Sequence, residues 1–133
     1  MILLDTHTLL WLMAGDNKLG AQSKEKIDNA YHQGQLAISA ISFWEIAMLQ
    51  NKGRIELTDN SQNWRKQRLR QGILEIPIDG EIGIHSTQLE NLHPDPADRF
   101  IVSTAILNDA MLITADRKIL NWKGELKSFD AGR

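Results

Sequence analysis

Short apolar runs alternate with longer, more polar segments along the chain. Strands are predicted for five such runs, at residues 2–4, 36–38, 73–78, 111–114 and 126–129. Pro77 indicates that the third run lies at a sheet edge or ends a strand. Helices are predicted at residues 8–13, 21–33, 39–53, 63–71, 79–92 and 96–106, with a short one after Asp116. Because strands that alternate with helices form a parallel sheet covered on both faces, the pattern predicts an α/β fold.

The composition is that of one globular domain, which we expect to span residues 1–133. Hydrophobic residues make up 42% of the chain and charged residues 24%, which is ordinary for a folded protein. Cysteine is absent, and this excludes disulfides, thiolate zinc sites and cysteine nucleophiles. The first residues lack the basic and long apolar segments of a signal peptide or membrane span, so a cytoplasmic protein is expected. The net charge of -2 counts against a nucleic-acid coat but not against an enzyme with an acidic pocket.

Four acidic residues fall at matching places in the predicted topology. Asp5 follows the first strand, and Asp116 lies two residues beyond Thr114 at the end of a later strand. Glu45 and Asp98 are expected in the first turns of helices. Since ligands of open parallel sheets bind outside the carboxyl ends of the strands, we expect the four carboxylates to converge on one pocket.

Converging carboxylates repel one another unless a cation neutralises them. Oxygen ligands without histidine or cysteine favour Mg²⁺ or Mn²⁺ over zinc. Mg²⁺ held in this way can activate a water molecule and stabilise a phosphoryl transition state. Phosphodiester hydrolysis is therefore the reaction that best fits the expected pocket.

Each acid also has a purely structural interpretation. Ser42 and Glu45 have the spacing of a helix capping box, and Asp95 and Asp98 could cap the helix that Pro96 opens. The two acids at strand ends could be ordinary turn residues. The functional interpretation is favoured because four acids occupy four matched places, and capping is compatible with metal binding.

The sequence resembles the PIN-domain family, and within it the VapC-type toxins of toxin–antitoxin pairs. Four segments carry the resemblance, in order and at fitting spacing: Ile2–Thr8, Ser39–Ala47, His93–Ile101 and Leu112–Asp116. It implies a three-layer α/β/α fold around a parallel sheet of four or five strands. It also implies a magnesium-dependent endoribonuclease, with Mn²⁺ as a possible substitute, that acts on RNA and is inhibited by a cognate antitoxin. Dimerisation is common in the family, so a homodimer is expected.

The same resemblance assigns roles within the site. Asp5 and Asp98 would be the principal metal ligands, Glu45 would complete or flank the site, and Asp116 would act directly or through water. Thr114 resembles the hydroxyl residue beside the fourth acid and would supply a supporting hydrogen bond.

Several residues allow two interpretations. His7 and His93 neighbour proposed acids and could contact RNA, but a structural role is favoured, and the four histidines show no metal-ligand spacing. Arg99 could pair with a carboxylate or orient a phosphate. The basic helix around Arg65 is more consistent with a solvated helix face than with a phosphate-binding surface. The tryptophans are more consistent with core or interface positions than with base stacking.

Two other functional classes compete with the nuclease. A phosphatase with Asp5 as nucleophile would need a second acid where His7 stands. A receiver-like binding module would have an acidic pair after the first strand, where this chain has Thr6 and His7. A PIN fold that only engages a partner would have lost some of the four acids, and all four are present here. RNA cleavage that requires a metal ion and forms no covalent enzyme intermediate would distinguish the nuclease from both the phosphatase and the binding module.

Overall fold

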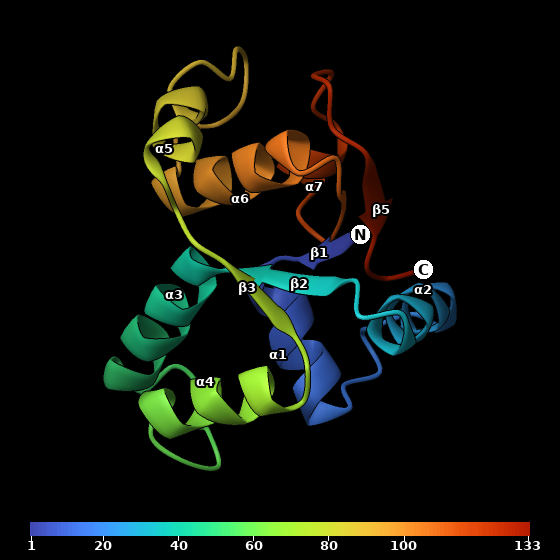
Figure 1. Ribbon diagram of the computed structural model, residues 1–133, viewed down its shortest axis with the longest axis vertical. Coiled ribbons are helices and arrows are strands. Elements are labelled where there is room, and N and C mark those ends of the chain that lie inside the picture. The colour runs from blue at the N-terminus through green and yellow to red at the C-terminus, as the bar shows by residue number, and fades with distance from the viewer.

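Five parallel strands form one central sheet (Figure 1). The computed structural model describes all residues, 1–133. The strands are β1 (Ile2–Leu4), β2 (Leu36–Ser39), β3 (Leu74–Ile76), β4 (Met111–Thr114) and β5 (Ser128–Asp130), in the order β3-β2-β1-β4-β5. The helices are α1 (Thr6–Ala14), α2 (Ala21–His32), α3 (Ala40–Asn51), α4 (Ser61–Arg70), α5 (Gly80–Ser86), α6 (Pro96–Leu107) and α7 (Arg117–Leu120). The predicted parallel sheet is confirmed, with both edge strands where the sequence placed them.

The central strands bury both of their faces. In β1, Leu3 packs into the apolar cluster on one side of the sheet and Leu4 into the cluster on the other. Leu112 and Ile113 of β4 divide between the same two clusters, and Leu3 is in register with Leu112. Successive side chains of a strand point to opposite faces, so a strand covered on both sides has to be apolar throughout. The unbroken apolar runs of the sequence follow from this burial.

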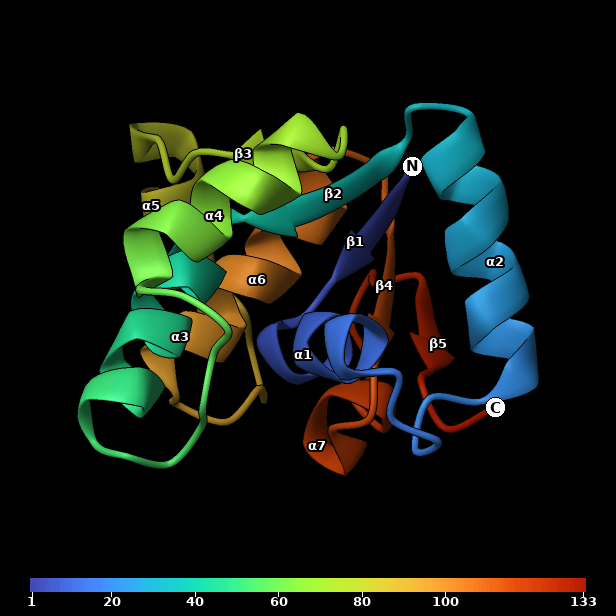
Figure 2. The same ribbon diagram turned by 90° about the horizontal axis from the view of Figure 1, so that it is seen from below.

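Helices form the two outer layers of the molecule. α1, α2 and α4 cover one face of the sheet, as Figure 2 shows from that side. α6 and α7 cover the opposite face, and α5 packs against α6. α3 flanks the sheet and contacts α1, α4 and α6. The three-layer α/β/α arrangement expected from the resemblance is confirmed.

The carboxyl ends of the three central strands meet at one end of the sheet. One residue separates α1 from β1, α3 follows β2 directly, and two residues separate α7 from β4 (Figure 2). The first turns of these helices therefore lie beside one another, although they are far apart in the sequence. This end of the sheet is where the four acids were expected.

Two helices differ from the prediction. α1 begins at Thr6 rather than at residue 8, because the carboxylate of Asp5 caps it by accepting a hydrogen bond from the Thr8 backbone N–H at 3.0 Å. The helix predicted over residues 79–92 was wrong in length, since α5 ends at Ser86. The Arg99 side chain donates hydrogen bonds to the backbone carbonyls of Ser86 and Leu89, and Asn91 adopts a positive φ of 63°. The segment after α5 therefore forms a loop. No helix has the length and apolar composition needed to cross a membrane.

Candidate active site

A hollow of about 370 Å³ lies at the carboxyl ends of the central strands. Nine residues line it: Asp5, Thr6, His7, Trp11, Glu45, Asp95, Asp98, Ala115 and Asp116. The structure thus brings together all four acids that the sequence singled out and adds Asp95 to them. Five carboxylates face this hollow, and no lysine or arginine does. We refer to it below as the acidic pocket.

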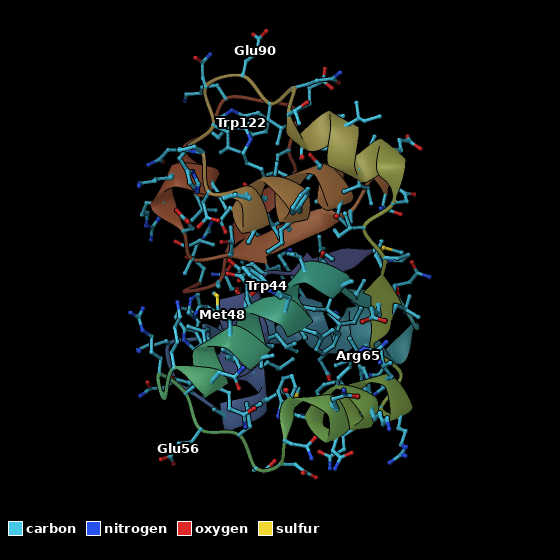
Figure 3. All side chains as sticks on the ribbon, turned by 90° about the vertical axis from the view of Figure 1, so that its left-hand side faces the viewer. Trp44, Met48, Glu56, Arg65, Glu90 and Trp122 are labelled. Carbon is cyan, nitrogen blue, oxygen red and sulfur yellow. The ribbon has the colours of Figure 1, made fainter.

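A larger hollow, of about 630 Å³, lies elsewhere on the molecule. Trp122 lines it, and the indole N–H of Trp122 donates a hydrogen bond to the carbonyl of Glu90 at 2.8 Å (Figure 3). Its lining mixes two glutamates with Lys123 and several amides and contains no converging set of acids. We therefore place the candidate active site in the smaller acidic pocket, because chemistry depends on the residues present and not on volume.

Asp5 is held at both of its carboxylate oxygens. Oδ1 accepts the capping hydrogen bond from the Thr8 N–H, and Oδ2 accepts a hydrogen bond from the hydroxyl of Thr114 at 2.5 Å. The Thr114 hydroxyl also accepts from the backbone N–H of Asp116 at 3.1 Å. Thr114 is fully buried. The hydrogen bond predicted from Thr114 to a neighbouring acid is therefore present, and it links the two acids at strand ends.

Glu45 lies in the second turn of α3, not in the first turn as predicted. α3 begins at Ala40 and is capped by Ser39, whose hydroxyl accepts from the Ile41 N–H at 3.2 Å. The proposed capping box of Ser42 and Glu45 is therefore wrong, because the helix starts three residues too early for it. Glu45 is left free to reach the acidic pocket.

Thr6 holds the Glu45 carboxylate in place. The Thr6 hydroxyl donates to Oε1 of Glu45 at 2.6 Å and lies 2.9 Å from the hydroxyl of Ser42. A hydroxyl has one proton, so Ser42 has to donate to Thr6 in turn. Burial raises the pKa of Glu45; the hydrogen bond from Thr6 opposes this rise, and the charges of Asp98 and Asp95 add to it.

Asp98 lies in the first turn of α6, as predicted. Asp95 caps this helix by accepting a hydrogen bond from the Ala97 N–H at 3.0 Å. Asp98 instead contacts His93, whose Nε2 lies 2.8 Å from Oδ2. Burial raises the pKa of Asp98, the hydrogen bond with His93 opposes the rise, and the charges of Asp95 and Asp116 add to it. Of the two, only Asp95 has the capping role that the structural interpretation proposed.

Asp116 caps α7 and lines the acidic pocket. Its Oδ1 accepts from the Lys118 N–H at 2.8 Å. Ligand atoms of His93, Asp98 and Asp116 all lie within 4.8 Å of one another, a spacing that one cation can bridge. Asp5 and Glu45 line the same pocket outside this tight group.

The donor set fits a hard divalent cation. The carboxylates of Glu45 and Asp98 are the two whose pKa values are raised by burial and by neighbouring acids, so ionising both in the absence of a cation is costly. Oxygen donors in this number are what Mg²⁺ and Mn²⁺ require. The pocket can therefore hold a metal ion, and the acids would be neutralised when it binds.

Arg99 does not pair with a carboxylate, the first of the two roles considered for it. Its guanidinium donates to the carbonyls of Ser86 at 2.9 Å, Leu89 at 2.7 Å, Leu92 at 2.8 Å and His93 at 3.3 Å. These contacts occupy four of its five N–H donors. Arg99 therefore fixes the loop between α5 and α6 and pairs with no carboxylate.

The basic helix α4 is only partly a solvated face. Arg65 forms a bidentate ion pair with Glu75 of β3, through contacts of 2.8 Å and 2.5 Å, and Arg68 is buried over the ring of Trp64. Arg65 thus ties α4 to β3, whereas the contacts of Arg68 with Trp64 and Gln67 lie within α4 itself. The predicted solvated face therefore holds for only part of α4.

The tryptophans occupy different environments. Trp64 is a core residue, whereas Trp44 is 55% exposed on the outer side of α3 beside Met48 (Figure 3). Trp11 lines the acidic pocket. A core position is therefore wrong for Trp44, and the interface position stays a prediction.

The sequence did not identify Thr6 as a residue of the site, and it left the role of His93 in the site open. Thr6 lies between two residues that had been considered, Asp5 and His7, but its partner Glu45 is 39 residues away. The one signal in the sequence is that Thr6 is a polar residue directly after a strand-end acid. Its burial is seen only in the structure. The contact between His93 and Asp98 could not be predicted from the sequence either, because it depends on the path of a loop.

The family to which the chain belongs agrees with the acidic pocket described above. The PIN domain family model matches residues 2–124, and the chain belongs to this family. A relative from Mycobacterium tuberculosis named Ribonuclease VapC22 is 33% identical over 119 residues, which are 89% of this chain and 88% of the relative. The family resemblance inferred from the four sequence segments is confirmed.

Solved structures share the same fold. A toxin–antitoxin complex from Klebsiella pneumoniae matches with a TM-score of 0.69 and 22% identity, and the match covers 98% of each chain. VapBC2 from Rickettsia felis, bound to a DNA fragment from the promoter, matches with a TM-score of 0.70 and 20% identity over the same 98% of each chain. At these identities the likeness establishes the fold and leaves the chemistry to the residues of this chain.

Proposed function

We propose that the protein is a metal-dependent endoribonuclease that uses Mg²⁺ or Mn²⁺ to hydrolyse RNA, and that it is the toxin of a toxin–antitoxin pair. The observation that carries the proposal is the acidic pocket itself, in which five carboxylates and no lysine or arginine face one hollow. Such a pocket repels RNA phosphates unless a cation is bound. The ribonuclease name of a relative that is 33% identical supports the choice of RNA as substrate.

The residues of the chain have separable tasks in this reaction. Asp5, Glu45, Asp98 and Asp116 would hold the cation, and Thr6 and Thr114 orient two of these carboxylates by hydrogen bonds. A bound Mg²⁺ supplies a Lewis acid for the phosphoryl oxygens and lowers the pKa of a water molecule. The buried walls of the pocket keep the carboxylates in place before substrate arrives, which reduces the reorganisation needed during the reaction.

The functional alternatives to a nuclease lose support. Membership of the PIN-domain family separates the chain from phosphatases with an aspartate nucleophile and from receiver domains. The remaining alternative is a PIN fold that only binds a partner. All four acids face the pocket here, and burial has raised the pKa values of two of them, which is a cost that a pure binding module has no reason to keep.

The antitoxin is the proposed protein partner. Toxin–antitoxin complexes are among the solved structures that share this fold. An antitoxin that placed a lysine or arginine in the acidic pocket would compete with the cation for the same carboxylates. Removing that side chain from the antitoxin should relieve inhibition.

Purified protein should cut total cellular RNA into discrete fragments in the presence of Mg²⁺ or Mn²⁺, and EDTA should abolish the cleavage. Gel analysis of the products, with Asp5→Asn as the matched control, checks this. The asparagine retains an oxygen that can accept from the Thr8 N–H, so the control should stay folded. Absence of both cleavage and cation binding in the wild-type protein would instead favour the binding module.

Replacing Thr114 by valine should lower the cleavage rate by about 10–100-fold, the usual cost of losing a partner that orients a metal ligand. The change removes the hydroxyl between Asp5 and Asp116, whereas Thr114→Ser retains it and should remain active. Steady-state kinetics with RNA measures the effect. Thr104→Val is a suitable control, because Thr104 is equally buried but its hydroxyl donates to the Phe100 carbonyl within α6. Equal rates for the two valine variants would contradict the proposed role.

A further inference from the structure

His93 contacts Asp98 without lining the acidic pocket. Its Nε2 lies 2.8 Å from Oδ2 of Asp98, and the two side chains are 15% and 21% exposed. Asp98 is among the residues that face the hollow, and His93 is not. A ring nitrogen of His93 also lies within 4.8 Å of a carboxylate oxygen of Asp116. The imidazole therefore reaches Asp98 at the margin of the pocket, and its contact with Oδ2 is the one hydrogen bond of the Asp98 carboxylate.

The other ring nitrogen of His93 identifies the tautomer. Nδ1 is buried and has no hydrogen-bond partner. An ionised Asp98 can only accept hydrogen bonds, so Nε2 has to carry the proton that lies between the two residues. An N–H at Nδ1 would be buried without an acceptor, so Nε2 is the nitrogen that donates. The N–H at Nε2 is thus directed at Asp98.

Arg99 holds the loop that carries His93. Its guanidinium binds the carbonyl of His93 and that of Leu92, in addition to two carbonyls nearer α5. Asp98 and Arg99 are neighbours in the first turn of α6. One turn of helix therefore fixes both the carboxylate and the backbone of the residue that contacts it.

We propose that His93 is a positioning residue for Asp98, and that Arg99 holds the His93 loop in the conformation this requires. The inference rests on the proposed function, since it takes Asp98 to bind the cation. Holding Oδ2 restricts rotation of the carboxylate and presents Oδ1 to the pocket. Thr6 and Thr114 do the same for Glu45 and Asp5, so that three of the four acids each have one side-chain donor.

Three substitutions of His93 test the proposal. The amide nitrogen of glutamine is as many bonds from the main chain as Nε2 of histidine, whereas that of asparagine corresponds to Nδ1. His93→Gln should therefore retain the hydrogen bond to Asp98, and His93→Asn and His93→Ala should lose it. We expect the latter two to weaken Mg²⁺ binding and to lower kcat by about 10–100-fold, with KM for RNA little changed, and His93→Gln to restore most of both.

The measurements are Mg²⁺ calorimetry, RNA kinetics and thermal unfolding of each variant. In addition, ¹⁵N NMR of the metal-free protein should show His93 protonated at Nε2. If His93→Gln is as impaired as His93→Ala while both remain folded, positioning is overturned and direct ligation of the cation by His93 replaces it. Unchanged Mg²⁺ affinity in all three variants also overturns it. If the wild-type protein cuts no RNA, the proposed function fails, but the Mg²⁺ affinities still decide the role of His93.

Discussion

Asp98→Asn is expected to lower RNA cleavage by about 10³-fold and, at the same time, to raise the melting temperature of the metal-free protein at neutral pH. Losing one ligand of a catalytic cation removes several kcal/mol of transition-state stabilisation, and each 1.36 kcal/mol is about a tenfold change in rate. The stability gain has a different origin. Burial and two neighbouring acids raise the pKa of Asp98, so its ionised form at neutral pH opposes folding. Asparagine has no charge to bury.

The two effects are measured separately, by kinetics with Mg²⁺ and by thermal unfolding with EDTA. Asp109→Asn is a matched control, since Asp109 is exposed and pairs with Lys127 at 2.6 Å, far from the acidic pocket. The hydrogen bond and charge of Lys127 lower the pKa of Asp109, so this substitution should leave cleavage unchanged and reduce stability slightly. A lower melting temperature for metal-free Asp98→Asn would show that its carboxylate supports folding, contrary to the argument.

Stabilisation of the protein by Mg²⁺ should be large at pH 7–8 and should disappear near pH 4. Glu45 and Asp98 both have pKa values raised above those of the unfolded chain. Their contribution to the free energy of unfolding is therefore fully present below the ordinary carboxyl range and is lost as the pH rises through the raised values. The cation binds the ionised pair and so restores stability only where the pair is ionised. At a concentration 100 times its dissociation constant, a bound cation adds about 2.7 kcal/mol.

Thermal unfolding between pH 4 and 8, with Mg²⁺ or with EDTA, checks this dependence. Asp109 and Asp130 have lowered pKa values and contribute with the opposite sign, because their stabilisation is lost as the pH falls. The comparison is therefore between the wild type and the double variant Glu45→Gln, Asp98→Asn, which retains those two groups. Mg²⁺ stabilisation of equal size at every pH in the wild type would exclude the proposed role of the pair.

The sheet and the convergence of the acids could be predicted because both follow from local patterns. A strand that is buried on both faces is an unbroken apolar run, and Leu3 and Leu4 lie in opposite cores as such a run requires. Parallel strands end at the same edge, so the positions of Asp5 and Asp116 in the sequence were enough to place them together.

Features that depend on contacts between distant segments could not be predicted. The hydrogen bond from Thr6 to Glu45 spans 39 residues and depends on how α3 lies beside α1. The capping box at Ser42 and the turn assigned to Glu45 were wrong because Ser39 and Ser42 are both good capping residues, and only the end of β2 decides between them. The length of α5 was wrong because Arg99, 13 residues beyond Ser86, binds the carbonyl of Ser86.

Helix capping divides the acids of the pocket into two groups with different evolutionary prospects. Asp5, Asp95 and Asp116 each accept a backbone hydrogen bond at the start of a helix, so folding alone is a reason to keep them. Glu45 and Asp98 cap nothing and oppose folding when no cation is bound. In a descendant released from selection for catalysis, Glu45 and Asp98 should be the first to be replaced, while the three caps persist. Those two positions therefore distinguish working nucleases from inactive copies of this fold better than a count of acidic residues does.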